Sequence, residues 1–243
     1  MNTALILAGG LDLRFQMDIP KQFVNVNNRP IIVYTLESFQ NHPDIDEIVV
    51  SCLSGWEELV RVYGKQFNIT KLKDIIPGGK DAQESTYRGL EAMKDRMESG
   101  DIVVVHDAIR PMVSEEIITK SMRMCRKKGM GVAATYIMDT IMNSGDGTEG
   151  YESINRYKIM KVQTPQSFDF QLLWELHNRA IRENCLGAWD NSSMITNLGE
   201  KVCFSKGSDL NLKINTVEDV EMFRALYQMK HPEEVMEEKQ GNE

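Results

Sequence analysis

The sequence predicts an α/β fold with a mostly parallel central sheet that helices flank on both faces. Two observations support this prediction: short apolar runs rich in β-branched residues recur along the chain, and stretches with helical spacing separate most of them. The runs are Ala4–Leu7, Ile48–Cys52, Ile102–Val105 and Val132–Ile137. Short apolar runs of this kind are typical of strands buried on both faces, which occur mainly in parallel sheets covered by helices.

Helical spacing first occurs after Pro30, where apolar residues up to Phe39 recur every three or four positions with the proline near the first turn. Further helices are expected at Glu84–Arg96, Ser114–Lys128 and Asp169–Glu183. Thr216 and Asp219 form a capping-box pattern that begins a last helix, which ends at about Met229. In such a fold, ligands bind beyond the carboxyl ends of the strands.

The pattern changes between Asp139 and Val162, where polar residues and three glycines interrupt a weakly alternating segment. We expect this segment, residues 139–162, to form an extended arm and not part of the core. The sequence predicts one domain over residues 1–230 that includes the arm. An acidic tail over residues 231–243 is expected to be disordered.

Composition excludes several classes of function. The net charge of −8 argues against broad binding to nucleic acid or to an anionic membrane surface. No stretch is apolar over the length of a membrane span, and the first apolar run is too short for a signal peptide. The four cysteines lie far apart without a C-x-x-C pair, which predicts neither a zinc site nor a disulfide framework, and favours a cytoplasmic protein.

Gly9 and Gly10 directly follow the first predicted strand. Glycines at this place let backbone N–H groups approach phosphates closely. Arg14 and Lys21 lie in the same loop and are candidates to hold a triphosphate. The loop matches neither the P-loop pattern nor the G-x-G-x-x-G pattern of dinucleotide folds. Taken alone, the glycine pair is equally compatible with a simple tight turn.

Further motifs follow in a fixed order: Pro20-Lys21-Gln22, Gly78-Gly79 with Ser85, His106 to Pro111, Asp139-Thr140, Arg156, Gln163 to Gln166, and Asn211-Leu212-Lys213. From residue 4 to about residue 225, this order resembles that of the cytidylyltransferases that act on 2-C-methyl-D-erythritol 4-phosphate or ribitol 5-phosphate. The resemblance implies a Rossmann-like fold of the nucleotidyltransferase type and a homodimer formed through the arm. It also implies transfer of CMP from CTP to a polyol phosphate, with release of pyrophosphate and use of Mg²⁺.

The resemblance assigns roles by position in this sequence. The implied catalytic residues are Arg14, Lys21 and Lys213, which would offset charge on the phosphoryl oxygens. The implied nucleotide-binding residues are Ala8, Gly9, Gly10, Gly79, Ser85, Asp107, Ala108 and Arg110. The implied acceptor-binding residues are Thr140, Arg156 and Lys213, and the first two lie on an arm that reaches into the partner subunit's site.

Asp107 follows the third predicted strand, so it should project from the carboxyl end of the sheet, where Mg²⁺ can meet a triphosphate. The alternative is that Asp107 only pairs with Arg110 or caps the next turn. Ser85 is equally compatible with a helix-capping residue. His106 is interpreted as a buried structural residue, because transfer to an already ionised phosphate needs no general base.

Three positions depart from the family pattern. Asp12 stands where the family usually has a glycine, and Ala82 stands where it usually has an arginine. Trp189 stands before Asp190, where the family usually has a threonine before the aspartate. Asp12 and Ala82 favour an alternative function, a non-catalytic nucleotide-binding or regulatory homologue. The retained basic residues favour an active transferase.

The sequence indicates the acceptor substrate less clearly than it indicates the reaction. A nucleotidyltransferase for hexose 1-phosphates would share the fold, but would not explain Arg156 and the segment 163–166. Three features are slightly closer to the ribitol 5-phosphate enzymes, although the methylerythritol enzymes share most of the same motifs: the segment Pro20–Phe23, an expected helix at Trp56, and the segment Gln163–Phe168.

Overall fold

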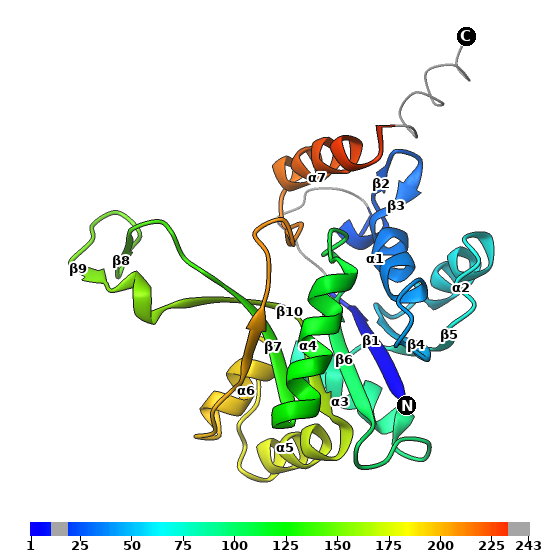
Figure 1. Cartoon of the computed structure of the whole chain (residues 1–243), viewed down its shortest axis with the longest axis horizontal. Coiled ribbons are helices and arrows are strands. Elements are labelled where there is room, and N and C mark those ends of the chain that lie inside the picture. Colours follow the sequence, from blue (N-terminus) through cyan, green and yellow to red (C-terminus); the bar gives the residue numbers. More distant parts are fainter. Residues whose placement is uncertain (11–18, 233–243) are drawn as a thin grey trace.

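A seven-stranded sheet forms the centre of the computed structural model, which describes residues 1–10 and 19–232 (Figure 1). The strand order is β11-β7-β10-β6-β1-β4-β5. Asp12 and Arg14 lie outside the described residues, as does the tail from residue 233, so the expectations for them stay predictions.

The four predicted strands are all present and run in the same direction. They are β1 (Asn2–Ala8), β4 (Glu47–Cys52), β6 (Ile102–Asp107) and β7 (Met130–Tyr136). β1 pairs in parallel with both β4 and β6. The prediction of a mostly parallel sheet flanked by helices is confirmed.

Three strands of this sheet were not predicted: β5 (Leu72–Pro77), β10 (Met160–Asp169) and β11 (Phe204–Lys206). β10 is antiparallel to both of its neighbours, β6 and β7. Its sequence contains Pro165 and two glutamines, which are uncommon in central strands, and this hides it from a search for apolar runs. The pairing of β10 with β7 is irregular between Val162 and Gln166, where β10 contains extra residues.

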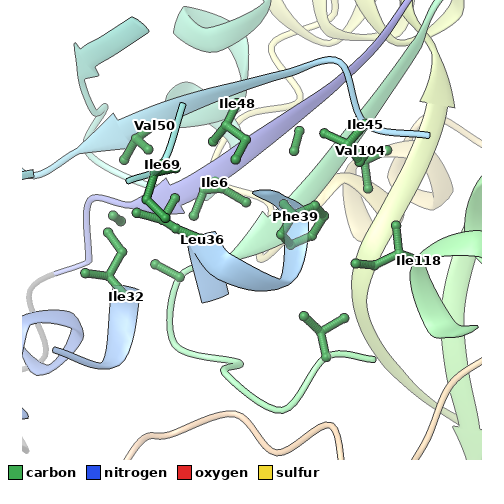
Figure 2. Packing of buried hydrophobic residues seen from close by; sticks show 14 of the residues in the cluster. Ile6, Ile32, Leu36, Phe39, Ile45, Ile48, Val50, Ile69, Val104 and Ile118 are labelled. Carbon is green, nitrogen blue, oxygen red and sulfur yellow. The ribbon is translucent and has the colours of Figure 1, made fainter. Parts of the chain in front are cut away.

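Helices cover both faces of the sheet. Alternate residues of β1 point to opposite faces: Ile6 contacts the cluster formed with α1 (Ile31–Gln40), α2 (Glu57–Gln66) and α4 (Glu115–Lys128), which Figure 2 shows from close by. Leu5 belongs to the opposite cluster, formed with α3 (Ala82–Met93), α5 (Phe170–Arg182) and α6 (Asn191–Asn197). α7 (Val217–Lys230) packs against α1 through Phe223. None of the helices in the described ranges is long and apolar enough to cross a membrane.

The helix ends follow the capping residues in the sequence. Ser114 and Asp169 each accept a backbone N–H as the N-cap of α4 and α5, and Thr216 forms the predicted capping box with Asp219. The predicted helix Glu84–Arg96 is wrong at both ends. It begins at Ala82, because the Asp81 side chain caps it, and it ends at Met93. The helix expected at Trp56 is α2, which begins directly after that residue, whereas α6 was not expected.

Residues after β7 project from the body as an arm, drawn in light green in Figure 1. It contains β8 (Ile141–Asn143) paired antiparallel with β9 (Glu152–Ile154), followed by the short 3-10 helix η3 (Arg156–Lys158). The boundary at residue 162 needs correction, because Met160 and Val162 already pair with β7 in the main sheet. The arm and its base expose several large side chains, namely Tyr136, Met138, Met142, Tyr151 and Tyr157.

Candidate active site

A cleft of about 480 Å³ opens beyond the carboxyl ends of β1 and β6. It is lined by the loop after β1, the loop between β5 and α3, the end of β6, and the segment before α7. Because these strands are parallel, their carboxyl ends meet at one edge of the sheet, where ligands bind in this class of fold.

The cleft brings together nine of the residues singled out from the sequence. They are Ala8, Gly9, Gly10, Lys21, Gly79, Ser85, Asp107, Ala108 and Lys213. Arg110 adjoins them through its ion pair with Asp107. Thr140 and Arg156 lie on the arm and are not among the described residues that line this cleft. Arg14 lies outside the described residues.

Lys21 is held at the cleft by a short, well-packed turn. It begins the 3-10 helix η2 (Lys21–Phe23), and Phe23 stacks on Trp56 with ring centroids 4.8 Å apart. Gln22 Nε2 donates to the carbonyl oxygen of Ala8 at 2.8 Å, which fastens this turn to the end of β1. Lys21 is largely buried, and its Nζ donates to Asn215 Oδ1 at 3.3 Å. The ammonium group is therefore fixed in place before any ligand binds.

Asn215 was not singled out from the sequence, and Gln22 was noted only as part of a motif. Both line the cleft. Gln22 could have been found from its place beside Lys21 in the Pro20-Lys21-Gln22 motif. Asn215 carries no local signal, because only the fold brings it to Lys21 from the distant segment before α7.

The loop between β5 and α3 is shaped by side chains of α3. The Gly79 N–H donates to Ser85 Oγ at 3.0 Å, and the Lys80 N–H donates to Glu84 Oε2 at 3.0 Å. A Cβ on Gly79 would lie 2.5 Å from the Glu84 side chain, so only glycine fits there. Ser85 is therefore not the helix cap that one interpretation made it, since Asp81 has that role, and its hydroxyl shapes the loop instead.

Arg88 reinforces the same loop from the next turn of α3. Its Nη2 donates to Glu84 Oε1 at 2.6 Å, and its Nη1 donates to the Gly78 carbonyl oxygen at 2.8 Å. Ala82, at the position where the family usually has arginine, lines the cleft with a methyl group. The loop is thus ordered by Glu84 and Arg88, although the positive charge expected at position 82 is missing.

Asp107 is the last residue of β6, and one of its carboxylate oxygens contacts two cationic side chains. Its Oδ2 accepts from Arg110 Nε at 2.9 Å and lies 3.2 Å from Lys213 Nζ. Burial alone would raise the pKa of the Asp107 carboxyl, but Lys213 and Arg110 together hold that pKa well below its usual range. The carboxylate stays ionised at neutral pH, and the ion pair with Arg110 named as an alternative is present.

His106 lies directly behind Asp107 and is fully buried. Its Nδ1 is 3.0 Å from Thr164 Oγ1, and its Nε2 is 3.3 Å from the Arg110 carbonyl oxygen. Burial lowers the pKa of His106 to about 3, so the ring is neutral at pH 7. These contacts agree with a structural role, since both ring nitrogens already have partners within the protein.

Acidification is expected to destabilise the fold through His106 and His177. Burial lowers the pKa of His177 to about 4, and its Nε2 is 3.0 Å from Asn191 Oδ1. Between about pH 6.5 and pH 4, the unfolded chain binds more protons at these histidines, so stability falls as pH falls. Each should contribute a loss of about 2 kcal/mol at about pH 5.

Urea unfolding at pH 7 and pH 5 tests this for the wild type and for His177→Gln, whose uncharged side-chain amide can donate to Asn191 Oδ1 in place of the imidazole. The variant should lose less stability on acidification than the wild type does. An equal loss in both proteins would show that His177 is not held neutral in the fold.

The arm residues lie apart from this cleft in a single chain. Thr140 is exposed, and Arg156 donates to the Met138 carbonyl oxygen and lies 5.4 Å from the centre of the Tyr157 ring. Of the three residues implied for the acceptor phosphate, Lys213 alone lines the cleft among the described residues. The single chain therefore does not bring the three together.

Known proteins similar to this chain include several cytidylyltransferases. The family model described as 2-C-methyl-D-erythritol 4-phosphate cytidylyltransferase matches residues 2–229. The chain is 38% identical to ribitol-5-phosphate cytidylyltransferase from Lacticaseibacillus paracasei, over 93% of this chain and 97% of that protein. It is 39% identical to 2-C-methyl-D-erythritol 4-phosphate cytidylyltransferase from Clostridium tetani, over 90% of this chain and 87% of that protein.

Solved structures are similar over nearly the whole chain. The 4-diphosphocytidyl-2C-methyl-D-erythritol synthase from Anaerococcus prevotii superposes with a TM-score of 0.78 at 26% identity, covering 93% of this chain and 98% of that one. The 2-C-methyl-D-erythritol 4-phosphate cytidylyltransferase from Thermus thermophilus superposes with a TM-score of 0.75 at 29% identity, with the same coverage. The chain therefore belongs to the 2-C-methyl-D-erythritol 4-phosphate cytidylyltransferase family of nucleotidyltransferases.

Proposed function

We propose that this chain transfers CMP from CTP to a polyol phosphate, with ribitol 5-phosphate as the preferred acceptor, and releases pyrophosphate. The observation that supports it most is the cleft, in which the glycine loop, Lys21, the Gly79–Ser85 loop and the Asp107–Lys213 pair meet. Backbone N–H groups and fixed cations at one sheet edge suit a bound triphosphate.

The proposed reaction forms one P–O bond and breaks another. A phosphate oxygen of the acceptor attacks the α-phosphorus of CTP, and the bond from that phosphorus to the β-phosphate oxygen breaks as pyrophosphate leaves. The attacking oxygen is already ionised, so no base is needed. The cleft's task is to align the two phosphates and to offset the negative charge between them, for which Lys21 and Lys213 are suitably placed.

The preference for ribitol 5-phosphate is supported by the relatives. The Lacticaseibacillus paracasei enzyme named for that acceptor is matched over 97% of its own length, against 87% for the Clostridium tetani enzyme named for 2-C-methyl-D-erythritol 4-phosphate, although the two identities, 38% and 39%, are nearly equal. The segments Pro20–Phe23 and Gln163–Phe168 and the helix at Trp56 are also slightly closer to that group.

Pyrophosphate release with CTP and Mg²⁺ tests the proposal across ribitol 5-phosphate, 2-C-methyl-D-erythritol 4-phosphate and a hexose 1-phosphate. We expect the highest kcat/KM with ribitol 5-phosphate and a CDP-polyol product detected by mass. Binding of CTP without turnover on any acceptor would instead favour the non-catalytic homologue that Ala82 and Asp12 suggest.

We further propose that Asp107 holds Mg²⁺ together with the triphosphate. Arg110 and Lys213 both contact Oδ2, and Oδ1 remains available to a cation in the part of the chain that is described. Within the described residues, no group of three or more His, Cys, Asp and Glu could hold a metal. The arrangement fits a cation that takes one carboxylate from the protein and its other ligands from substrate oxygens and water, as Mg²⁺ often does. When bound, Mg²⁺ would offset phosphate charge.

Asp107→Asn is expected to lower kcat by about tenfold or more and to raise the Mg²⁺ concentration needed for half-maximal rate, because one charged ligand is lost. Titration of Mg²⁺ against the wild type and the variant measures both effects. Asparagine has nearly the same shape as aspartate, so Lys213 and Arg110 should not need to rearrange much and the fold should be preserved. If both proteins remain equally active in excess chelator, the metal has no part in the reaction.

A homodimer and a cytoplasmic location complete the proposal. The exposed apolar side chains of the arm would gain burial against a second copy, and that copy would bring Arg156 and Thr140 to the cleft. The cysteines Cys52, Cys125, Cys185 and Cys203 are all free, which suits a reducing compartment.

A further inference from the structure

Gln163 lies in the irregular stretch of β10 and is buried, with 2% of its surface exposed. The pairing of β10 with β7 stops at Val162 and resumes at Gln166, and the pairing of β10 with β6 begins at Gln166. Gln163 therefore lies between the regular pairs of the sheet. A buried amide needs hydrogen-bond partners, so the bonds of the Gln163 side chain show what this residue holds.

The Gln163 side chain binds the backbone of the segment that follows β11, residues 207–213, which we call the carrier segment. Its Nε2 donates to the Ser208 carbonyl oxygen at 2.8 Å, and its Oε1 accepts the Ser208 N–H at 3.2 Å. The amide thus pairs with both backbone groups of one residue, as a neighbouring strand would. Its Oε1 also accepts from Asn211 Nδ2 at 3.4 Å. An added Cβ on Gly207 would lie 2.4 Å from that oxygen, so a larger residue at this position would push the amide away.

A second set of hydrogen bonds connects the carrier segment to Asp107. Asn211 is buried, and its Nδ2 donates to the Thr164 carbonyl oxygen at 2.7 Å. The Asn211 carbonyl oxygen accepts from Arg110 Nη1 at 3.0 Å, while Arg110 Nε donates to Asp107 Oδ2. Thr164 Oγ1 accepts the Asp107 N–H at 3.0 Å. The carrier segment and the aspartate are therefore fixed to the same stretch of β10.

Lys213 is the last residue of the carrier segment. Its Nζ lies 3.2 Å from Asp107 Oδ2, although its side chain is 40% exposed. A long lysine side chain has many rotamers, so the place of its ammonium group depends on where its backbone is held. On one side of Lys213, the Ile214 N–H donates to the Ile109 carbonyl oxygen at 2.9 Å. On the other side, the bonds of Gln163 hold the backbone.

We infer that Gln163 is a positioning residue for Lys213: it holds the carrier segment so that the ammonium group lies beside Asp107 at the cleft. The inference rests on the proposed function, in which Lys213 offsets negative charge between the two phosphates. Gln163 is not among the described residues that line the cleft, and it acts through the backbone of Ser208. A displacement of about 1 Å in a group that aligns reactants can lower a rate about a hundredfold, so loss of these bonds should be visible in turnover.

Steady-state kinetics of Gln163→Met test the inference, because methionine has a similar length but lacks the amide. We expect kcat to fall about tenfold or more and KM for CTP to stay within about twofold. Gly207→Ala should give the same result from the other side of the contact, because its methyl group would displace Gln163 Oε1. The matched controls are Gln171→Met, at an exposed position of α5, and Gly145→Ala, where an added Cβ meets nothing within 4 Å. Both controls should leave kcat and KM unchanged.

A double variant separates positioning from a general structural role. In a chain that already has Lys213→Ala, adding Gln163→Met should lower kcat by less than about twofold, because no ammonium group is left to misplace. If the two losses multiply instead, Gln163 acts on the fold or on another residue, and the inference is wrong. A normal rate in both Gln163→Met and Gly207→Ala would also overturn it.

Competitive acetylation of lysines supplies a readout that does not depend on turnover. Mass measurement of the labelled peptides gives the rate at Lys213 relative to Lys73, an exposed lysine on the edge strand β5. An ammonium group held against a carboxylate must leave it to react, so Lys213 should be labelled about threefold faster or more in Gln163→Met and Gly207→Ala than in the wild type. Equal labelling in all three proteins would overturn the inference. Absent turnover of the wild type on every acceptor would count against the proposed function alone, while the labelling would still decide whether Gln163 holds Lys213.

Discussion

Lys21→Ala is expected to lower kcat by about two orders of magnitude or more while the fold stays intact. Lys21 Nζ is positioned at the cleft by Asn215 and by the packed η2 turn, so its charge is in place before the reaction begins. A preorganised cation stabilises charge that develops at phosphorus more than charge in the bound substrate, so kcat should fall more than KM rises.

Pyrophosphate release measures the rate, and thermal unfolding checks the fold. Lys80→Ala is the matched control, because Lys80 also lines the cleft but its side chain is exposed on the Gly79–Ser85 loop. Its effect should be much smaller. Arg14, which the sequence assigns to the same task, is expected to give a loss similar to that of Lys21. A near-normal rate in Lys21→Ala would show that its charge does not act at phosphorus.

Mixing Lys21→Ala chains with Arg156→Ala chains is expected to restore activity that neither variant has alone. If the arm of one subunit completes the cleft of the other, a mixed dimer has one cleft with both native residues and one with neither. After random exchange, half of the dimers are mixed, so the mixture should recover about a quarter of the wild-type rate.

The recovery should require exchange of subunits, for example after brief dilution and reconcentration, and it should be absent in freshly mixed samples. Mass measurement at micromolar concentration should show a dimer for each protein. A monomer, or an exchanged mixture that stays inactive although both variants fold, would mean that Arg156 serves its own chain.

The sequence predicted the parts of the fold that depend on local apolar pattern. β1, β4, β6 and β7 are continuous apolar runs, and α4, α5 and α7 begin at capping residues, so each has a signal within a few neighbouring positions. β10 could not be found in this way. It is a strand because β6 and β7 pair with it from both sides, and that pairing depends on residues far away in the sequence.

Residues of the candidate site could likewise be predicted only where the sequence carries a local signal. Glycines after a strand and an aspartate at a strand end are local signals, so Gly9, Gly10 and Asp107 were predicted to lie at the sheet edge, and they do. Asn215 has no such signal, because its role comes from a contact with Lys21 that is made only after folding. The role proposed for Arg156 depends on a second chain, and one sequence contains no direct information on how two copies would meet.

The irregular stretch of β10 limits where insertions and deletions can occur as the sequence diverges. From Val162 to Gln166, β10 advances four residues while β7 advances only two, from Ala134 to Val132. Side chains alternate between the two faces of a strand. Loss or gain of a single residue here would therefore move each side chain at the base of the arm to the opposite face of the sheet. The tip of the arm, between Asn143 and Glu152, has no such constraint. Insertions and deletions among relatives should therefore accumulate at the tip and be absent from residues 163–165.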